Sequence, residues 1–365
     1  MMLQVENLGK DVGTETHLHD MSFQLTAASL NVLLGPTQAG KTSLLRLLAG
    51  LDRPTRGRIL LNGEDITERS VRRRSVALVY QQFINYPSLT VFENIASPLR
   101  RQRVGGRELD RRVRETATML GIEALLQRMP DELSGGQQQR TALARALVRE
   151  ADLLLVDEPL VNLDYKLREQ LRDELKSIFA ARGSIVVYTT TEPLEALMLG
   201  GSIQVLNAGR LLQSGPTIEV YQRPATVEVG RVFSDPPINL LPGQIGADAA
   251  RIGEVTLPLS GYLRGIPEGD YQFGVRASHL SVDDSRRRSA AAVPLEAIVE
   301  LAEISGSETF IHLRHGPTSF VVQEEGVASF ALGEKLRIWV DPDRLYVFQP
   351  EGALVAAPEF RGIMT

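Results

Sequence analysis

The sequence predicts an α/β domain built around a phosphate-binding loop, followed by a smaller all-β domain. The first observation is residues 35–42, which read G-x-x-x-x-G-K-T between an apolar run and a run with helical spacing. The second is the succession of buried strands and amphipathic helices up to about residue 232. The third is the change, after Pro236 and Pro237, to short strands with many glycines. We therefore expect domains at 1–235 and 236–365.

Composition narrows the classes of protein that fit. The chain has 365 residues and a formal net charge of −5, which gives no support for a nucleic-acid binder. It has no cysteine, which excludes disulfides and thiolate metal sites. The N-terminus lacks a signal-peptide pattern, and no apolar run approaches the ~18 residues that span a bilayer. We expect any membrane role to be peripheral, through a partner.

The first elements lead into the phosphate-binding loop. Residues 1–34 alternate apolar and polar positions, which predicts antiparallel strands ending in a buried strand over 30–34. A helix over 41–49 follows and can end at Gly50. Its N-terminus adds partial positive charge where the loop N–H groups converge. We expect Lys41 to reach the β- and γ-phosphates and the Thr42 hydroxyl to ligate Mg²⁺. The alternative is a chance glycine turn. The predicted loop residues are Gly35, Pro36, Thr37, Gln38, Ala39, Gly40, Lys41, Thr42 and Ser43.

The middle of the chain turns helical. A strand over 75–80 follows Arg72, Arg73 and Arg74. We expect these three arginines to be exposed to solvent where the chain enters the strand, with phosphate binding as the lesser alternative. A helical subdomain is predicted over about 87–150. Within it, Ser134 and Gln137 form the S-x-x-Q capping box of a helix that continues through residue 147.

Two carboxylates follow the next buried strand, over 153–156. Asp157 is expected to hold Mg²⁺ directly or through water, and Glu158 to polarise an attacking water. Two acids that merely cap a strand end are the alternative. A helix over 166–182, a strand over 184–189 and a helix opening at Pro193 come next.

The helix that starts at Ser134 is a second candidate anion site. Its residues are Ser134, Gly135, Gly136 and Gln137, whose glycines leave backbone N–H groups open to close approach. One phosphate does not need two such sites in one chain. We therefore expect this segment to complete a nucleotide pocket on another subunit.

Taken in order, these motifs resemble the ATPase subunit of an ATP-binding-cassette transporter. The resemblance is carried by 35–42, Gln81, the Leu-Ser-Gly-Gly-Gln segment 133–137, 153–158 and Asn-Leu-Asp at 162–164. Residues 1–232 match the nucleotide-binding domain. Segments 214–216, 221–224, 274–276 and 306–309 are similar to maltose-type importers with a C-terminal oligonucleotide-fold-like (TOBE) domain. Residues 80–87 resemble the glycerol importers, in which two different ATPase subunits pair.

The resemblance implies a head-to-tail dimer with ATP between the phosphate loop of one chain and the Ser134 segment of the other. It implies that Gln81 senses Mg²⁺ and nucleotide, and that the surface around Phe83 to Leu99 receives a short cytoplasmic helix of a membrane permease. Two permease subunits are implied as partners through this surface. Core packing is the alternative for Phe83, Tyr86 and Phe92. A solute-binding protein and a location at the cytoplasmic face of the bacterial inner membrane are implied as well.

Three positions depart from the family pattern. Thr191 stands where a switch histidine contacts the γ-phosphate, Val12 where an aromatic stacks on adenine, and Val161 where a serine opens the Asn-Leu-Asp stretch. Threonine carries no positive charge, so we expect this chain's own site to hydrolyse ATP poorly and its Ser134 segment to serve a different partner ATPase. Threonine or a water could also substitute adequately. The remaining alternatives are a homodimeric sugar-importer ATPase and a soluble ATP-dependent regulatory switch.

Overall fold

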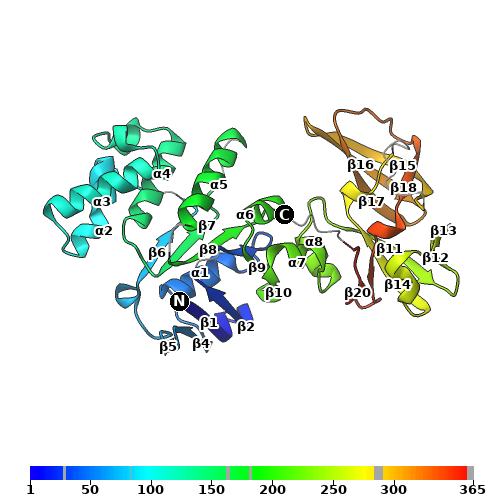
Figure 1. The fold of residues 1–365 in the computed structure, drawn as a ribbon, viewed down its shortest axis with the longest axis horizontal. Coiled ribbons are helices and arrows are strands. Elements are labelled where there is room, and N and C mark those ends of the chain that lie inside the picture. Colours follow the sequence, from blue (N-terminus) through cyan, green and yellow to red (C-terminus); the bar gives the residue numbers. More distant parts are fainter. Residues whose placement is uncertain (28–29, 83, 162–164, 181–182, 283–290, 360–365) are drawn as a thin grey trace. The chain divides into compact units, whose positions relative to one another are not determined.

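The computed structural model describes residues 1–27, 30–82, 84–161, 165–180, 183–282 and 291–359. The chain forms two compact units, Met1–Thr217 and Ile218–Thr365, which are considered separately below (Figure 1).

The central sheet of the first unit has six strands in the order β10-β9-β3-β8-β7-β6. Five of them pair in parallel, and β10 pairs antiparallel with β9. β3 and β7 are nearly continuous apolar runs because both faces of a parallel sheet are covered. The strands are β3 (Leu30–Leu34), β6 (Val76–Val79), β7 (Leu153–Asp157), β8 (Ile185–Thr190), β9 (Ser202–Asn207) and β10 (Arg210–Pro216). The accompanying helices are α1 (Lys41–Ala49), α5 (Tyr165–Ala180) and α6 (Pro193–Leu199).

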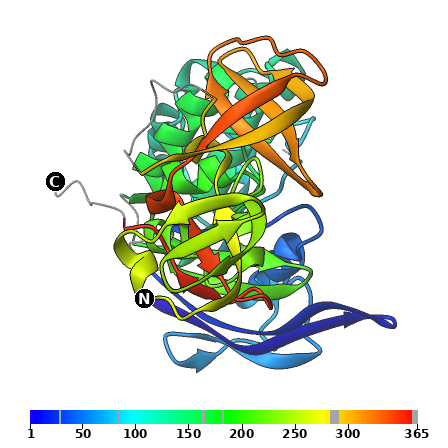
Figure 2. The same ribbon diagram turned by 90° about the vertical axis from the view of Figure 1, so that its right-hand side faces the viewer.

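A second, antiparallel sheet has the order β2-β1-β4-β5, and its two longest strands form an extended ribbon (Figure 2). The strands are β1 (Met2–Val12), β2 (Glu15–Thr26), β4 (Arg56–Leu61) and β5 (Glu64–Asp65). Leu25 of this sheet, Leu44 of α1 and Leu155 of the central sheet belong to one buried cluster. The helix that follows the phosphate loop is therefore fixed between two sheets.

Arg74 corrects one expectation about the arginine run. Arg72 and Arg73 are exposed as expected, but Arg74 is buried. Its guanidinium donates to five backbone carbonyls, two of them at the end of α1, and burial lowers its pKa. The last carbonyls of a helix have no partner within the helix. Arg74 supplies that partner, so its side chain lies in the core and is not exposed to solvent as expected.

The helical segment between β6 and β7 contains α2 (Val91–Arg101), α3 (Gly106–Met119) and α4 (Gly135–Leu147). Ser134 and Gln137 form the capping box that the sequence predicted at the start of α4. Thr90 and Glu93 form a further capping box at the start of α2. Among the helices of the described ranges, none is long and apolar enough to cross a membrane.

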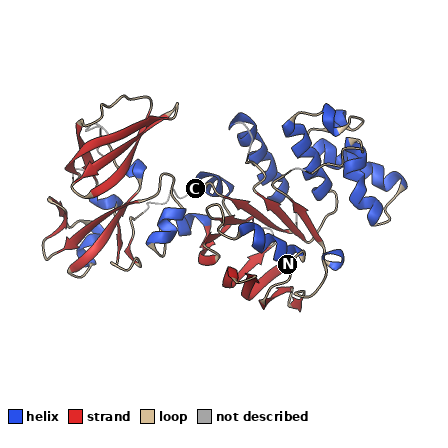
Figure 3. Ribbon diagram, turned by 180° about the vertical axis from the view of Figure 1, so that it is seen from behind, coloured by secondary structure: helices blue, strands red, loops and turns tan. Residues whose placement is uncertain are grey.

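Strands dominate the second unit (Figure 3). Its two sheets have the orders β13-β12-β11-β14-β19-β20 and β17-β16-β15-β18, and both contribute to one core that includes Phe273, Leu313 and Ile338. The first comprises β11 (Asn239–Ile245), β12 (Ala249–Ile252), β13 (Val255–Pro258), β14 (Gly269–Val275), β19 (Tyr346–Phe348) and β20 (Leu354–Ala356). The second comprises β15 (Val293–Ile304), β16 (Glu308–His315), β17 (Thr318–Glu325) and β18 (Lys335–Val340).

Residues 218–235 group with this unit, whereas the sequence placed the boundary at 235/236. They include most of α7 (Thr217–Gln222) and all of α8 (Val227–Val232). The segment is hydrogen-bonded to residues 352–354, and it also contacts Arg276, which is 3% exposed. Its guanidinium donates to the carbonyls of Tyr221 and Phe233 and lies 3.7 Å from the centre of the Tyr221 ring. This buried cation binds the two helices to the β-sheet.

Candidate functional site

The phosphate loop joins β3 to α1 through a backbone that requires glycine. Gly40 has a φ of 97° and precedes the first residue of α1. A Cβ on Gly35 would lie 2.4 Å from the carbonyl oxygen of Leu206. Both positions exclude larger residues, so the loop can keep its N–H groups at the helix N-terminus, where anions bind.

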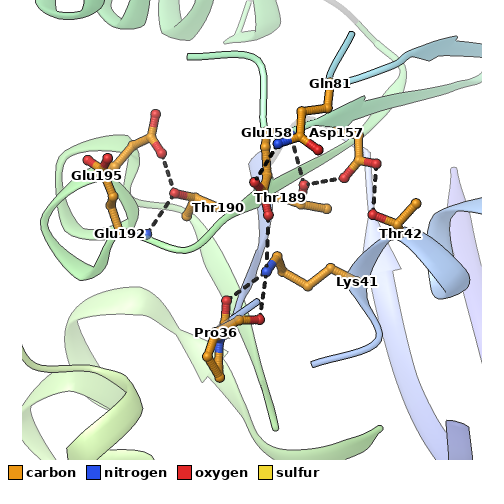
Figure 4. A network of polar contacts seen from close by, with 11 residues as sticks. Pro36, Lys41, Thr42, Gln81, Asp157, Glu158, Thr189, Thr190, Glu192 and Glu195 are labelled. Carbon is orange, nitrogen blue, oxygen red and sulfur yellow. Dashed lines mark hydrogen bonds and ion pairs between the residues drawn. The ribbon is translucent and has the colours of Figure 1, made fainter. Parts of the chain in front are cut away.

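Lys41 lies in the loop with its ammonium buried, at 3% exposure. Its Nζ donates to the carbonyls of Gly35 (2.7 Å) and Pro36 (3.0 Å) and lies 3.1 Å from Oε1 of Glu158 (Figure 4). An ammonium has three donors, and all three face the loop and the carboxylate. The structure therefore places the positive charge of Lys41 within the phosphate loop and pairs it with the carboxylate of Glu158, directly after β7.

Asp157 lies at the end of β7 between two hydroxyl groups. Thr42 Oγ1 donates to its Oδ2 at 2.9 Å, and Thr189 Oγ1 donates to its Oδ1 at 2.8 Å. Burial raises the pKa of Asp157, and the two hydroxyl hydrogen bonds oppose that rise. The carboxylate predicted to hold a metal thus adjoins the hydroxyl predicted to ligate it.

Glu158 follows with a φ of 43°, a left-handed conformation that is uncommon outside glycine. Its N–H donates to Thr189 Oγ1 at 2.9 Å. Its carboxylate contacts Lys41 and accepts a hydrogen bond from Gln81 Nε2 at 3.3 Å. Residues from α1, β7 and the segment after β6 therefore meet at one point, as the sequence order suggested.

The end of β8 carries three threonines in a row. Thr190 is buried, and its hydroxyl donates to Glu195, which also accepts from Tyr188 at 2.6 Å. Burial raises the pKa of Glu195. Thr191 follows directly after the strand and is half-buried. Thr190 and Glu195 therefore form a network separate from Asp157 and Glu158. Sequence reasoning missed Thr189, although consecutive hydroxyl residues at the end of a buried strand were a usable signal.

The second predicted anion site lies on an exposed surface. Ser134 Oγ accepts from the N–H of Gln137 at 3.4 Å, and Gln137 Oε1 accepts from the N–H of Ser134 at 3.0 Å. Ser134 and Gly135 are exposed, and a Cβ on Gly135 would meet open space. The helix start is therefore accessible to another molecule. Residues 162–164 lie outside the described residues, and Val161 is half-buried.

The segment after Gln81 connects the site to the helices. Asn85 donates to the carbonyl of Gln138 in α4 at 2.8 Å, and the guanidinium of Arg145 lies 4.9 Å from the centre of the Tyr86 ring. Ile84 and Tyr86 are 54% and 37% exposed. Phe83 lies outside the described residues, and Phe92 is half-buried. The segment therefore exposes the apolar side chains of Ile84 and Tyr86 to solvent and also contacts α4, the helix that begins after Ser134.

Comparison with known proteins decides the family. The chain is 36% identical over 361 residues to the trehalose/maltose import ATP-binding protein of Thermococcus litoralis, covering 95% of this chain and 97% of that protein. It belongs to the ABC transporter family. The family model for ABC transporters matches residues 18–161, and the model for the TOBE domain matches residues 273–348. Both domains inferred from the motifs are thereby confirmed.

Other ABC relatives agree with this assignment. The sn-glycerol-3-phosphate import ATP-binding protein of a Ruegeria species is 35% identical over 353 residues, covering 96% of this chain and 97% of that protein. A solved dimeric bacterial ABC transporter cassette superposes with a TM-score of 0.54 at 29% identity, covering 59% of this chain and 98% of the other. A post-hydrolysis dimeric cassette bound to ADP and phosphate superposes with a TM-score of 0.53. The predicted fold class is confirmed, and family membership supports nucleotide binding by the first unit.

Val12 occupies the position where the ABC resemblance implies an adenine-stacking aromatic. It is the last residue of β1 and is 50% exposed. A valine offers far less area for stacking than an aromatic ring. The assignment of Val12 to the adenine-stacking position remains a prediction.

Proposed function

We propose that this ABC ATPase subunit energises uptake of a polyol or sugar at the cytoplasmic face of the inner membrane, with glycerol as the favoured substrate. Relatives named for trehalose/maltose and glycerol-3-phosphate import support the substrate class. The single observation that carries the activity is the cluster of Lys41, Thr42, Asp157 and Glu158 at the end of the phosphate loop. These residues bring a cation, a hydroxyl and two carboxylates together, which is the donor set that phosphoryl transfer uses.

The cluster suits a nucleotide phosphate with Mg²⁺. The loop backbone would bind the phosphates, and Lys41 would exchange its contacts with loop carbonyls for phosphate oxygens. Thr42, Asp157 and Gln81 supply oxygens of the kind that Mg²⁺ prefers. When held by these residues, Mg²⁺ would supply neutralisation of charge on the transferring phosphoryl group. Glu158 would then orient and deprotonate the attacking water once the phosphate draws Lys41 away from it.

Pairing with a different ATPase subunit is the second part of the proposal. This chain has Thr191 at the switch position, directly after β8, while its exposed Ser134 helix start is fully formed. Its own site would bind ATP and hydrolyse it slowly, and its Ser134 segment would complete a competent site on the partner. The exposed surface at Ile84 and Tyr86, within the Phe83–Leu99 segment, would contact two permease subunits. A solute-binding protein would deliver the substrate to them.

Purification through this chain from membranes tests the proposal. We expect a complex with two different ATPase polypeptides and two permeases, identified by mass spectrometry. A complex with this chain as its sole ATPase would establish the homodimeric sugar-importer alternative. Recovery of the chain in the soluble fraction alone, at native expression, would favour the regulatory switch.

Substitution Thr191→His should raise ATP turnover of the isolated chain about tenfold to a hundredfold. Hydrogen bonds to charged groups contribute about 1.5–3 kcal/mol, and each 1.4 kcal/mol corresponds to a factor of ten in rate. Phosphate release measured under saturating MgATP checks this, with Thr191→Ser as a control that keeps a neutral hydroxyl. Wild-type turnover of ~1 s⁻¹ or more would mean that threonine suffices and would remove the basis for an asymmetric dimer.

A further inference from the structure

Thr189 is a fully buried polar residue that the family motifs leave unassigned. It lies in β8, has no solvent exposure, and pairs in register with Asp157 of the neighbouring parallel strand β7. Burial of a hydroxyl is costly unless its hydrogen bonds are made. The partners of Thr189 are therefore informative about why a hydroxyl occupies this position.

The hydroxyl of Thr189 joins the two acidic residues of the site. It donates to Asp157 Oδ1 at 2.8 Å and accepts from the N–H of Glu158 at 2.9 Å (Figure 4). Thr42 donates to the other oxygen of Asp157 at 2.9 Å. Each carboxylate oxygen of Asp157 thus has its own hydroxyl donor, which fixes the plane of the carboxylate and directs Oδ2 toward Thr42.

The backbone at Glu158 needs such an anchor. Its φ of 43° is a strained conformation for a residue with a side chain, and strain persists where the surroundings determine it. Thr189 holds the N–H of Glu158, and the amide of the fully buried Gln139 donates to the carbonyl of the next residue, Pro159. The left-handed turn that presents the Glu158 carboxylate is therefore held from both sides.

Neighbouring threonines do not duplicate this role. Successive side chains in a strand point to opposite faces, and the hydroxyl of Thr190 contacts Glu195 instead. Thr191 lies beyond the strand. Thr189 is thus the threonine of this triplet whose hydroxyl contacts the end of β7.

We propose that Thr189 is a positioning residue that sets the orientation of Asp157 toward Mg²⁺ and of Glu158 toward the attacking water. This proposal rests on the proposed nucleotide-binding function. A hydroxyl present only to fill the core would be replaceable by valine, which has the same shape. A hydroxyl that orients the carboxylate would not, because valine leaves Asp157 Oδ1 and the Glu158 N–H without their partner.

The test is ATP binding to the full-length chain by calorimetry, once in EDTA and once with Mg²⁺. In Thr189→Val we expect affinity in EDTA to stay within about twofold of wild type, and the gain in affinity from Mg²⁺ to fall about tenfold, as loss of one hydrogen bond to a charged group predicts. Thr189→Ser keeps the hydroxyl and should keep the gain. Thr190→Val is the matched control, since it removes the adjacent hydroxyl from a different network.

Two results would overturn the assignment: an undiminished Mg²⁺ gain in Thr189→Val, or an equal loss in Thr189→Ser. If thermal unfolding shows that the valine variant does not fold, Thr189→Cys gives the same comparison, because a thiol has similar size and is a weak donor. If the wild-type chain binds no ATP in either buffer, the proposed nucleotide-binding function is wrong. That result is distinguishable from failure of the Thr189 proposal, which concerns only the gain in affinity from Mg²⁺.

Discussion

Replacement of Lys41 by alanine should weaken MgATP binding by about a hundredfold or more. The Lys41 ammonium is buried between two loop carbonyls and Glu158, so it is already held at the point where phosphate oxygens would enter. Each charge-assisted hydrogen bond contributes about 1.5–3 kcal/mol, and two such bonds to phosphate exceed a factor of 100 in affinity. Removal of the cation also leaves the negative charge of Glu158 unpaired, so that it repels the phosphates of the nucleotide.

Calorimetric titration with MgATP measures the effect. Lys10→Ala is the matched control, since Lys10 is a lysine of the same unit whose Nζ donates to the backbone carbonyl of Arg53, outside the phosphate loop. We expect the control to bind as wild type. Unchanged affinity in Lys41→Ala, with circular dichroism confirming that the variant is folded, would remove the phosphate-loop assignment.

Elements defined by local patterns could be predicted from the sequence. The apolar run before Asp157 has no polar interruption, so a buried parallel strand was the natural interpretation, and the carboxylates necessarily emerged at its end. The glycine loop and the Ser134 capping box are likewise specified by residues that are neighbours in the chain. In these cases spacing alone determines which groups converge.

Features that depend on distant partners could not be predicted. Arg74 looked like part of an exposed basic run because the carbonyls that it satisfies belong to the end of α1, more than 20 residues earlier. The hydroxyl of Thr189 forms its hydrogen bonds with Asp157 and Glu158, which precede it by more than 30 residues. Residues 218–235 contact Arg276 and residues 352–354 of the C-terminal unit, and no local pattern connects either to them. Tertiary hydrogen bonds of buried polar groups decide each case.

In the assembled transporter, Ser134→Arg should reduce substrate-stimulated ATP hydrolysis about a hundredfold, whereas Glu158→Gln in this chain should reduce it no more than about twofold. Ser134 begins α4 on an exposed surface beside a glycine with open space, where the proposed partner nucleotide lies. An arginine there fills that space and removes a cap whose loss alone costs about 1 kcal/mol. It therefore damages the one site that we expect to turn over rapidly.

The comparison of the two variants is the test, because neither Ser134 nor Glu158 lies in the Phe83–Leu99 segment proposed to contact the permeases. Ser134→Ala removes the cap without adding bulk and should retain most of the activity, which separates blockage of the partner's pocket from loss of helix stability. Glu158→Gln acts on the site that has Thr191 in place of the switch histidine, where our proposal expects little hydrolysis to lose. Hydrolysis and uptake would be measured together in reconstituted vesicles. Equal, severe losses from Glu158→Gln and Ser134→Arg would show that both sites turn over, and the two ATPase sites would then be equivalent despite Thr191.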